Sequence, residues 1–241
     1  MVEGRKTYGV CAVCGYRTDK AGMTRHLAKP HAQDSAAGQP VLQYHLRVEG
    51  ANGLYWLDVE AKANARLRHL DQFLRRIWLE CCGHLSEFEI AGVDYQVKLF
   101  PEDRWLESTF SLGFGPRSRS MSARLGDVLS PGLAFRYRYD FGSTTELRLK
   151  VVCAYDGRAP RTPIRLLARN EAVQWRCAEC GAPATEICAL CGDYPEQIVF
   201  CEEHAQVHGA DVHRGDDAAF LPVVNSPRMG VCAYTGPLDG P

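Results

Sequence analysis

Apolar and polar positions alternate through much of the middle of the chain, as they do in β-strands with one buried face. Residues 41–49 and 54–59 are rich in β-branched and aromatic side chains and flank Gly50-Ala51-Asn52-Gly53, a sequence typical of a hairpin turn. Shorter runs of the same kind predict strands at 88–90, 95–100, 110–112, 134–139 and 146–152. A mostly antiparallel sheet is therefore expected.

One segment has helical periodicity instead. Asn64 is a suitable N-cap, and Gly83 is a suitable stop signal. Between them, apolar side chains recur at three- and four-residue steps: Leu67, Leu70, Phe73, Leu74, Ile77, Trp78 and Cys81. The pattern predicts one long helix, residues 64–81, packed on the sheet, and hence an α+β fold.

Composition agrees with a globular protein, since 46% of the 241 residues are hydrophobic and 24% are charged. No run of about 18 apolar residues exists, so no membrane span is expected. The N-terminus lacks the apolar core of a secretory signal, which makes a cytoplasmic location the expectation. In that reducing compartment, eleven cysteines, several in Cys-x2-Cys pairs, favour metal ligation over disulfides.

The formal net charge of −1 conceals a strong asymmetry along the chain. Residues 1–31 and 41–170 each carry a net charge of +4, whereas residues 177–217 carry nine acids against one arginine, a net of −8. An acidic segment repels phosphate. Contacts with nucleic acid are therefore expected from the front of the chain, and a protein partner from the acidic C-terminal part.

The first candidate metal site lies near the N-terminus. Its ligands are Cys11, Cys14, His26 and His31. Thiolate and imidazole are the ligands that zinc prefers, and the spacing resembles a Cys-Cys-His-His zinc finger over about residues 8–32. The interval before His26 is one residue short, and Thr18 stands near the place of a core aromatic. The alternative is a redox cysteine pair with two unrelated histidines.

This finger is a poor candidate for sequence-specific DNA recognition. Its base-contacting positions would be Asp19, Gly22 and Arg25, and Gly22 has no side chain to reach a base. Phosphate contacts from Arg17, Lys20, Arg25 and Lys29 are the remaining option. Met23 and Leu27 are expected to bury apolar atoms against Tyr8, Val10 or Tyr16.

The second candidate unit spans about residues 175–215. Its eight ligands follow one another as pairs: Cys177 and Cys180, Cys188 and Cys191, Cys201 and His204, His208 and His213. The pattern resembles the B-box zinc-binding domain, especially at residues 201–208. The resemblance implies that the first and third pairs share one zinc ion and the second and fourth pairs another. The alternatives are two sequential ribbons, or one zinc ion with spare ligands.

Together these sets predict twelve ligands and three zinc ions. Cys81, Cys82, Cys153, Cys232, His45, His69 and His84 stay unassigned. Cys81 and Cys153 are expected to be buried thiols, while a redox or nucleophilic pairing of Cys82 with His84 is the alternative. The domains expected are a zinc finger at 8–32, an α+β domain at 41–170, the double-zinc module at 175–215 and a flexible tail at 216–241.

The middle domain has its own resemblance. The run Phe135–Gly142 alternates aromatic and basic residues before Asp140-Phe141-Gly142, and His84-Leu85-x-x-Phe88 follows the predicted helix. Together they resemble the plasmid pRiA ORF-three-like family over residues 41–155. That implies an α+β fold and a link to plasmid or transposon DNA, with no settled activity. Ser143, Thr145 and Leu147 replace the family's Asp, Trp and His.

Three functions are therefore weighed. A non-enzymatic zinc-binding adaptor, contacting a protein through its acidic module, is expected first. The alternative is a nucleic-acid-binding protein that uses the finger and the middle arginines, in which case the Tyr/Arg strand would stack on bases rather than bury one face. An enzyme in the middle domain ranks lowest, because paired carboxylates, a P-loop and a nucleophile–base set are missing from the sequence.

Overall fold

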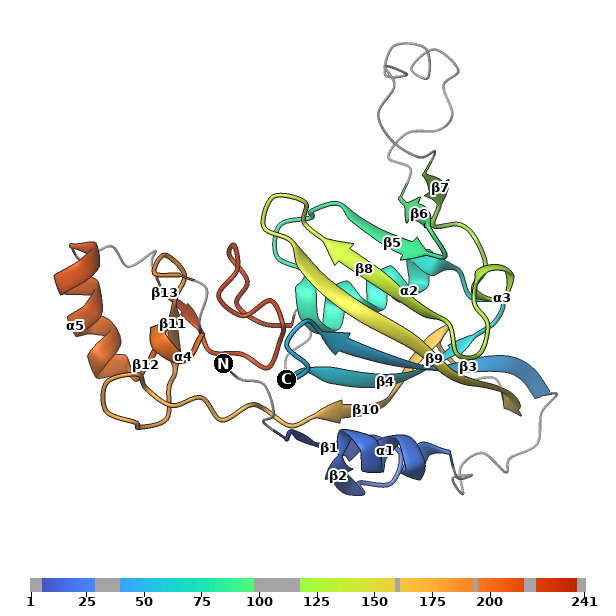
Figure 1. Cartoon of the computed structure of the whole chain (residues 1–241), viewed down its shortest axis with the longest axis horizontal. Coiled ribbons are helices and arrows are strands. Elements are labelled where there is room, and N and C mark those ends of the chain that lie inside the picture. Colours follow the sequence, from blue (N-terminus) through green and yellow to red (C-terminus); the bar gives the residue numbers. More distant parts are fainter. Residues whose placement is uncertain are drawn as a thin grey trace, which may run out of the picture.

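A ten-stranded sheet dominates the computed structural model, which describes residues 6–28, 40–97, 118–158, 161–192, 195–214 and 220–237 (Figure 1). The strand order is β2-β1-β10-β4-β3-β9-β8-β5-β6-β7, and its pairs are antiparallel apart from β6 with β7. The strands are β1 (Tyr8–Cys11), β2 (Arg17–Asp19), β3 (Pro40–Gly50), β4 (Trp56–Lys62), β5 (Ser86–Ile90), β6 (Val93–Gln96), β7 (Arg119–Ser120), β8 (Ala134–Tyr139), β9 (Thr145–Arg158) and β10 (Ile164–Asn170). The expected α+β class with a mostly antiparallel sheet is confirmed.

Several strand limits differ from the sequence patterns. The second strand of the first hairpin begins at Trp56 and continues to Lys62, and β10 was not predicted. In β10, arginines interrupt the apolar positions and a register shift follows Leu166, so the simple alternation is lost. The predicted strand at 110–112, and the end of that at 95–100, lie outside the described residues.

The central helix is shorter than expected. Helix α2 (Leu67–Leu74) begins after Arg66, whose N–H donates to His69 Nδ1 at 3.1 Å, so Asn64 is not its cap. The helix continues as one π-helical turn, η2 (Arg75–Leu79), and ends at Glu80. Its apolar side is buried on the sheet apart from Ile77, which is half-buried. The residues after Leu79, including Cys81, therefore belong to the following loop rather than to the helix.

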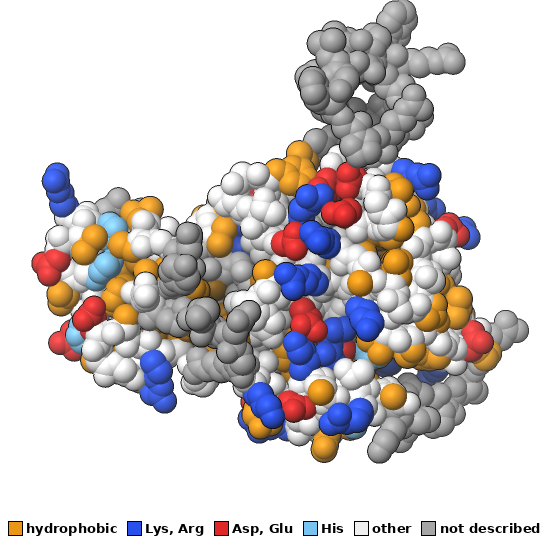
Figure 2. Space-filling view, viewed as in Figure 1, with side chains coloured by type: hydrophobic (Ala, Val, Ile, Leu, Met, Phe, Trp, Pro, Cys, Tyr) orange, Lys and Arg blue, Asp and Glu red, His pale blue; other side chains and the backbone are white. Residues whose placement is uncertain are grey.

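Strand β8 has one buried and one solvated face, as the simpler interpretation of its Tyr/Arg pattern predicted. Phe135, Tyr137 and Tyr139 are buried, whereas Arg136 is exposed. Figure 2 shows basic and acidic side chains intermixed over the central sheet. The aromatic rings of β8 are thus core residues and are not available to stack on bases.

The N-terminal strands extend the central sheet, because β1 pairs with β10 as well as with β2. Beside them lies helix α1 (Lys20–Leu27), whose Met23 is fully buried with Cys11, Trp56 and Ala168. Tyr8, Val10 and Tyr16 are exposed, and the partly buried side chains that pack against this cluster are Val13 and Leu27. Trp56 of β4 supplies the buried aromatic ring of this cluster.

The C-terminal module has a small sheet of its own, in the order β12-β11-β13. The module consists of β11 (Glu186–Cys188), α4 (Pro195–Ile198), β12 (Val199–Phe200), α5 (Glu202–His213) and β13 (Phe220–Pro222). The remaining short helix, α3 (Leu125–Val128), belongs to the central domain. None of the helices in the described ranges has the length and apolar character needed to cross a membrane.

Where the sequence predicts a flexible tail, the structure packs residues 220–237 against the rest of the molecule. Ser226, Arg228 and Tyr234 are fully buried. Ser226 Oγ donates to the carbonyl oxygen of Trp78 at 2.6 Å, at the end of the central helix. Buried polar contacts of this kind hold the segment against the central domain.

Candidate metal centres

Three of the four expected finger ligands lie together. The ligand atoms of Cys11, Cys14 and His26 are within 4.8 Å of one another, and Cys14 Sγ is 3.2 Å from His26 Nε2. Cys11 ends β1, and the turn after it closes when Gly15, at φ +76°, donates its N–H to the Cys11 carbonyl at 2.9 Å. His31 lies outside the described residues. The local turn and helix α1 thus bring both ends of the finger to one point.

The first C-terminal group contains Cys177, Cys180, Cys201 and His204. Cys180 Sγ is 3.9 Å from Cys201 Sγ, and Cys201 Sγ is 3.2 Å from His204 Nδ1. The first pair comes from a turn in which the Gly181 N–H donates to the Cys177 carbonyl. The second pair comes from the start of α5, whose N-cap is Cys201. Two distant turns therefore converge on one group.

The second C-terminal group contains Cys188, Cys191, His208 and His213. Cys191 Sγ lies 3.2 Å from His208 Nε2 and 3.1 Å from His213 Nε2. Cys188 ends β11, while both histidines lie on α5. The two groups thus combine first with third and second with fourth pairs, which is the interleaved arrangement that the B-box resemblance implies.

Comparisons with known proteins identify no family. No protein-family model matches the chain, and no curated protein matches it significantly. Among solved structures, the chain is similar to the crystal structure of MM3350, a protein of unknown function from Methanosarcina mazei Go1. That similarity has a TM-score of 0.40 at 17% identity, over 53% of this chain and 67% of the other. Function is therefore inferred from the side chains themselves.

The electrostatics of the first C-terminal group favour the thiolate form at two of its three cysteines, Cys177 and Cys201. Burial opposes ionisation of Cys177, but backbone N–H groups of Cys180, Cys201 and Glu179 outweigh it and lower the pKa of its thiol to about 6. Hydrogen bonds from the backbone and side chain of His204 lower the pKa of Cys201. The N–H of Ala182 has the same tendency at Cys180, but burial and the neighbouring Cys177 and Cys201 thiols outweigh it and raise the pKa of Cys180. Because thiolate is the form that binds a metal ion, Cys177 and Cys201 are the cysteines of this group that are best prepared for ligation.

A fourth group was not predicted. Cys81, Cys82, His84 and Cys232 bring their ligand atoms within 4.8 Å of one another. The spacing of the first three is a local signal, but Cys232 is 150 residues from Cys82 and nothing in the sequence links them. Two of the other unassigned side chains have structural partners, since His45 Nε2 contacts Asp58 at 2.7 Å and His69 accepts from Arg66.

Proposed function

We propose that this chain is a non-enzymatic zinc-binding protein that acts as an adaptor, with its acidic C-terminal module contacting another protein. The supporting observation is that each C-terminal group contains four Cys and His side chains. In this proposal the finger holds one zinc ion through Cys11, Cys14, His26 and His31, and the C-terminal groups hold two more.

Zinc suits these groups better than other metals. Around a tetrahedral zinc ion, bonds of about 2.3 Å to sulfur and 2.0–2.1 Å to nitrogen separate two thiolates by about 3.8 Å and a thiolate from an imidazole by about 3.5 Å. The C-terminal groups have a sulfur–sulfur distance of 3.9 Å and sulfur–nitrogen distances of 3.1–3.2 Å. The donor set and the sulfur–sulfur distance fit that geometry, whereas the sulfur–nitrogen distances are about 0.3–0.4 Å shorter than it requires.

Closed sites favour a structural role for the ions. When four protein side chains fill the coordination sphere, no position is left for water or substrate. The C-terminal module has short strands and one helix, so metal cross-links supply stability that its small core lacks. The ions then shape a surface instead of performing a reaction.

That surface includes the outer side of α5. Glu203, Val207 and Asp211 are exposed at four-residue steps and therefore share one helix face. Val207 is 53% exposed, and Leu190 in the neighbouring turn is 61% exposed. Apolar side chains among acids suit a protein segment that carries both basic and apolar residues.

Ion pairs argue against the nucleic-acid alternative. Arg17 pairs with Glu171 at 2.6 Å and Lys20 with Glu49 at 2.6 Å, so two of the finger's expected phosphate contacts are already neutralised. On β8, Arg138 pairs with Glu87 at 2.6 Å. Membership of the plasmid pRiA ORF-three-like family, and with it an association with mobile DNA, stays a prediction.

One cavity among the described residues offers a place for an active site in the central domain. It has a volume of about 550 Å³ and is lined in part by Asp71, Arg75 and Ser86. The Asp71 carboxylate, however, accepts hydrogen bonds from Ser86 Oγ at 2.6 Å and Tyr137 Oη at 2.7 Å and pairs with Arg75. A carboxylate engaged in this way stabilises the core and does not favour general-base chemistry.

The adaptor proposal is tested with the full chain as bait in a cross-linking pull-down. We expect Glu203→Lys/Asp211→Lys to lose a protein that the wild type captures, because charge reversal on α5 repels a basic partner. The matched control is Asp127→Lys/Asp156→Lys, which reverses two exposed acids outside the module. Equal capture by both variants, or no specific capture by the wild type, would contradict the proposal.

A further inference from the structure

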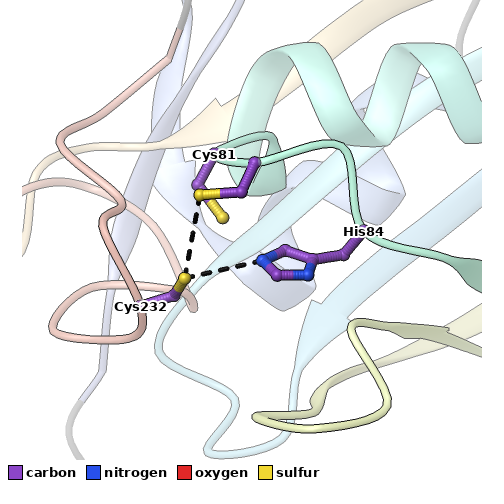
Figure 3. Close-up of side chains that lie close together, drawn as sticks. Cys81, His84 and Cys232 are labelled. Carbon is purple, nitrogen blue, oxygen red and sulfur yellow. Dashed lines mark hydrogen bonds between the residues drawn. The ribbon is translucent and has the colours of Figure 1, made fainter.

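The unpredicted group lies outside both Cys/His modules. Cys232 Sγ is 3.9 Å from Cys82 Sγ and 3.5 Å from His84 Nε2. These distances match the edges of about 3.8 and 3.5 Å expected between ligands of a tetrahedral zinc ion. Figure 3 shows Cys81, His84 and Cys232 approaching one another from two separate segments of the chain.

Both chain segments that form this group contain a residue with positive φ. Gly83 has φ +72°, and no atom lies within 4 Å of the place where a Cβ would be. Its backbone conformation, and not a lack of room for a side chain, therefore favours glycine at this position. Opposite it, Cys232 has φ +56°, which is uncommon for a residue with a side chain. Such conformations often accompany functional sites, where surrounding interactions hold them.

The neighbouring side chains support a site with bound thiolates. Arg228 Nη2 lies 3.4 Å from Cys81 Sγ and 2.8 Å from Asp140 Oδ2, and its side chain is fully buried. Hydrogen bonds from a guanidinium stabilise metal-bound sulfur, and such outer partners orient the ligands of metal sites.

We propose that Cys81, Cys82, His84 and Cys232 form a fourth zinc site, which fastens the C-terminal segment to the end of the central helix. Three thiolates and one imidazole would complete a closed, structural coordination sphere. The proposal extends the proposed zinc-binding function to a site between the central domain and the C-terminal segment.

A disulfide fits this group less well. The Cys82 and Cys232 sulfurs are 3.9 Å apart, and a disulfide requires about 2.05 Å. It would also leave Cys81 and His84 without a role in the group. A metal ion uses all four side chains, and it links positions 150 residues apart in the chain.

Metal content of the full chain, purified under reducing conditions, tests the proposal. We expect about four zinc ions per chain in the wild type and about three in Cys232→Ser and His84→Ala. Cys153→Ser is the matched control, because Cys153 is half-buried and belongs to none of the metal-binding groups among the described residues. Cys232→His, which replaces one zinc ligand by another, should keep all four ions.

Metal content distinguishes the absence of the fourth zinc site from the absence of zinc binding as a whole. Zinc content that Cys232→Ser leaves unchanged, while Cys188→Ser lowers it by about one ion, removes the fourth site and keeps the module sites. A wild-type chain without zinc removes both.

Thiol labelling of the wild type covers the case in which the variants fail to fold. Cys232 is exposed, so a free thiol there would react readily with iodoacetamide. We expect it to be protected until a chelator is added. Immediate labelling, or protection that only a reductant removes, would overturn the proposal, since the latter indicates a disulfide.

Discussion

Asp58 is a buried charge that connects the central sheet to the finger. Its carboxylate is fully buried and accepts two hydrogen bonds from Arg47, both at 2.8 Å. Arg47 also donates to Thr24 Oγ1 at 2.8 Å on helix α1. One ion pair therefore neutralises two buried charges and holds the finger helix against the sheet.

Replacing this carboxylate by an amide should be costly. We expect Asp58→Asn to lower the free energy of unfolding by about 3 kcal/mol, because Arg47 would keep its charge in a buried position without a counterion. Urea unfolding followed by circular dichroism measures the change. Asp127→Asn, at an exposed position, should stay within about 0.5 kcal/mol of the wild type. An equally small effect at Asp58 would show that the pair is not important for stability.

At the scale of elements, strand β1 belongs to the finger and to the central sheet at once. A Cβ at Gly9 would lie 2.4 Å from Cη2 of Trp56 and 2.5 Å from the carbonyl oxygen of Arg169. Only glycine lets β1 approach β4 and β10 this closely. Trp56 is the buried aromatic ring that packs with Cys11 and Met23 of the finger.

Gly9→Ala should therefore separate β1 from the sheet. Overpacking of this kind typically costs about 1–3 kcal/mol. Hydrogen exchange should become faster in β1 and in its partner β10, while β8 keeps its protection. The control is Val10→Ala, because Val10 is the next residue of β1 and its side chain is exposed. Unchanged exchange in Gly9→Ala would mean that the finger tolerates a looser contact with the sheet.

The elements also show how far sequence patterns reach. Strand β8 and the buried side of α2 follow from periodicity, because each side chain's burial repeats with the geometry of its own element. The start of α2 does not, since His69 caps it from inside the helix. Strand β10 could not be predicted in this way, because Arg165 and Arg169 interrupt its apolar pattern. In the structure Arg165 pairs with Glu60, and Arg169 donates to the Asn225 carbonyl.

At the scale of the whole molecule, the C-terminal segment returns to the central domain after the module is complete. Arg228 donates to Asp140 and to Thr145 Oγ1, and Ser226 donates to the Trp78 carbonyl. The central domain is therefore not closed by its own residues alone. Residues C-terminal to the module pack against one end of the central domain, where Arg228 neutralises the charge of Asp140.

A chain ending at Asn170 should accordingly be less stable than the full protein. Losing the partner of a buried carboxylate costs on the order of 3 kcal/mol, which corresponds to a decrease in Tm of roughly 6–12 °C. Differential scanning calorimetry measures it, with a chain ending at residue 237 as the control that keeps the described segment. An unchanged Tm for the shorter chain would show that residues 220–237 contribute nothing to the central domain.

The sequence alone determined the local ligand pairs of this protein. Two cysteines with two residues between them, followed by Gly15 or Gly181, form a tight turn whose spacing is visible in the sequence without knowledge of the fold. Only the tertiary structure decided that β1 joins the central sheet and that Cys232 meets Cys82 and His84. Those contacts depend on segments brought together by burial, and burial leaves no fixed spacing between distant residues.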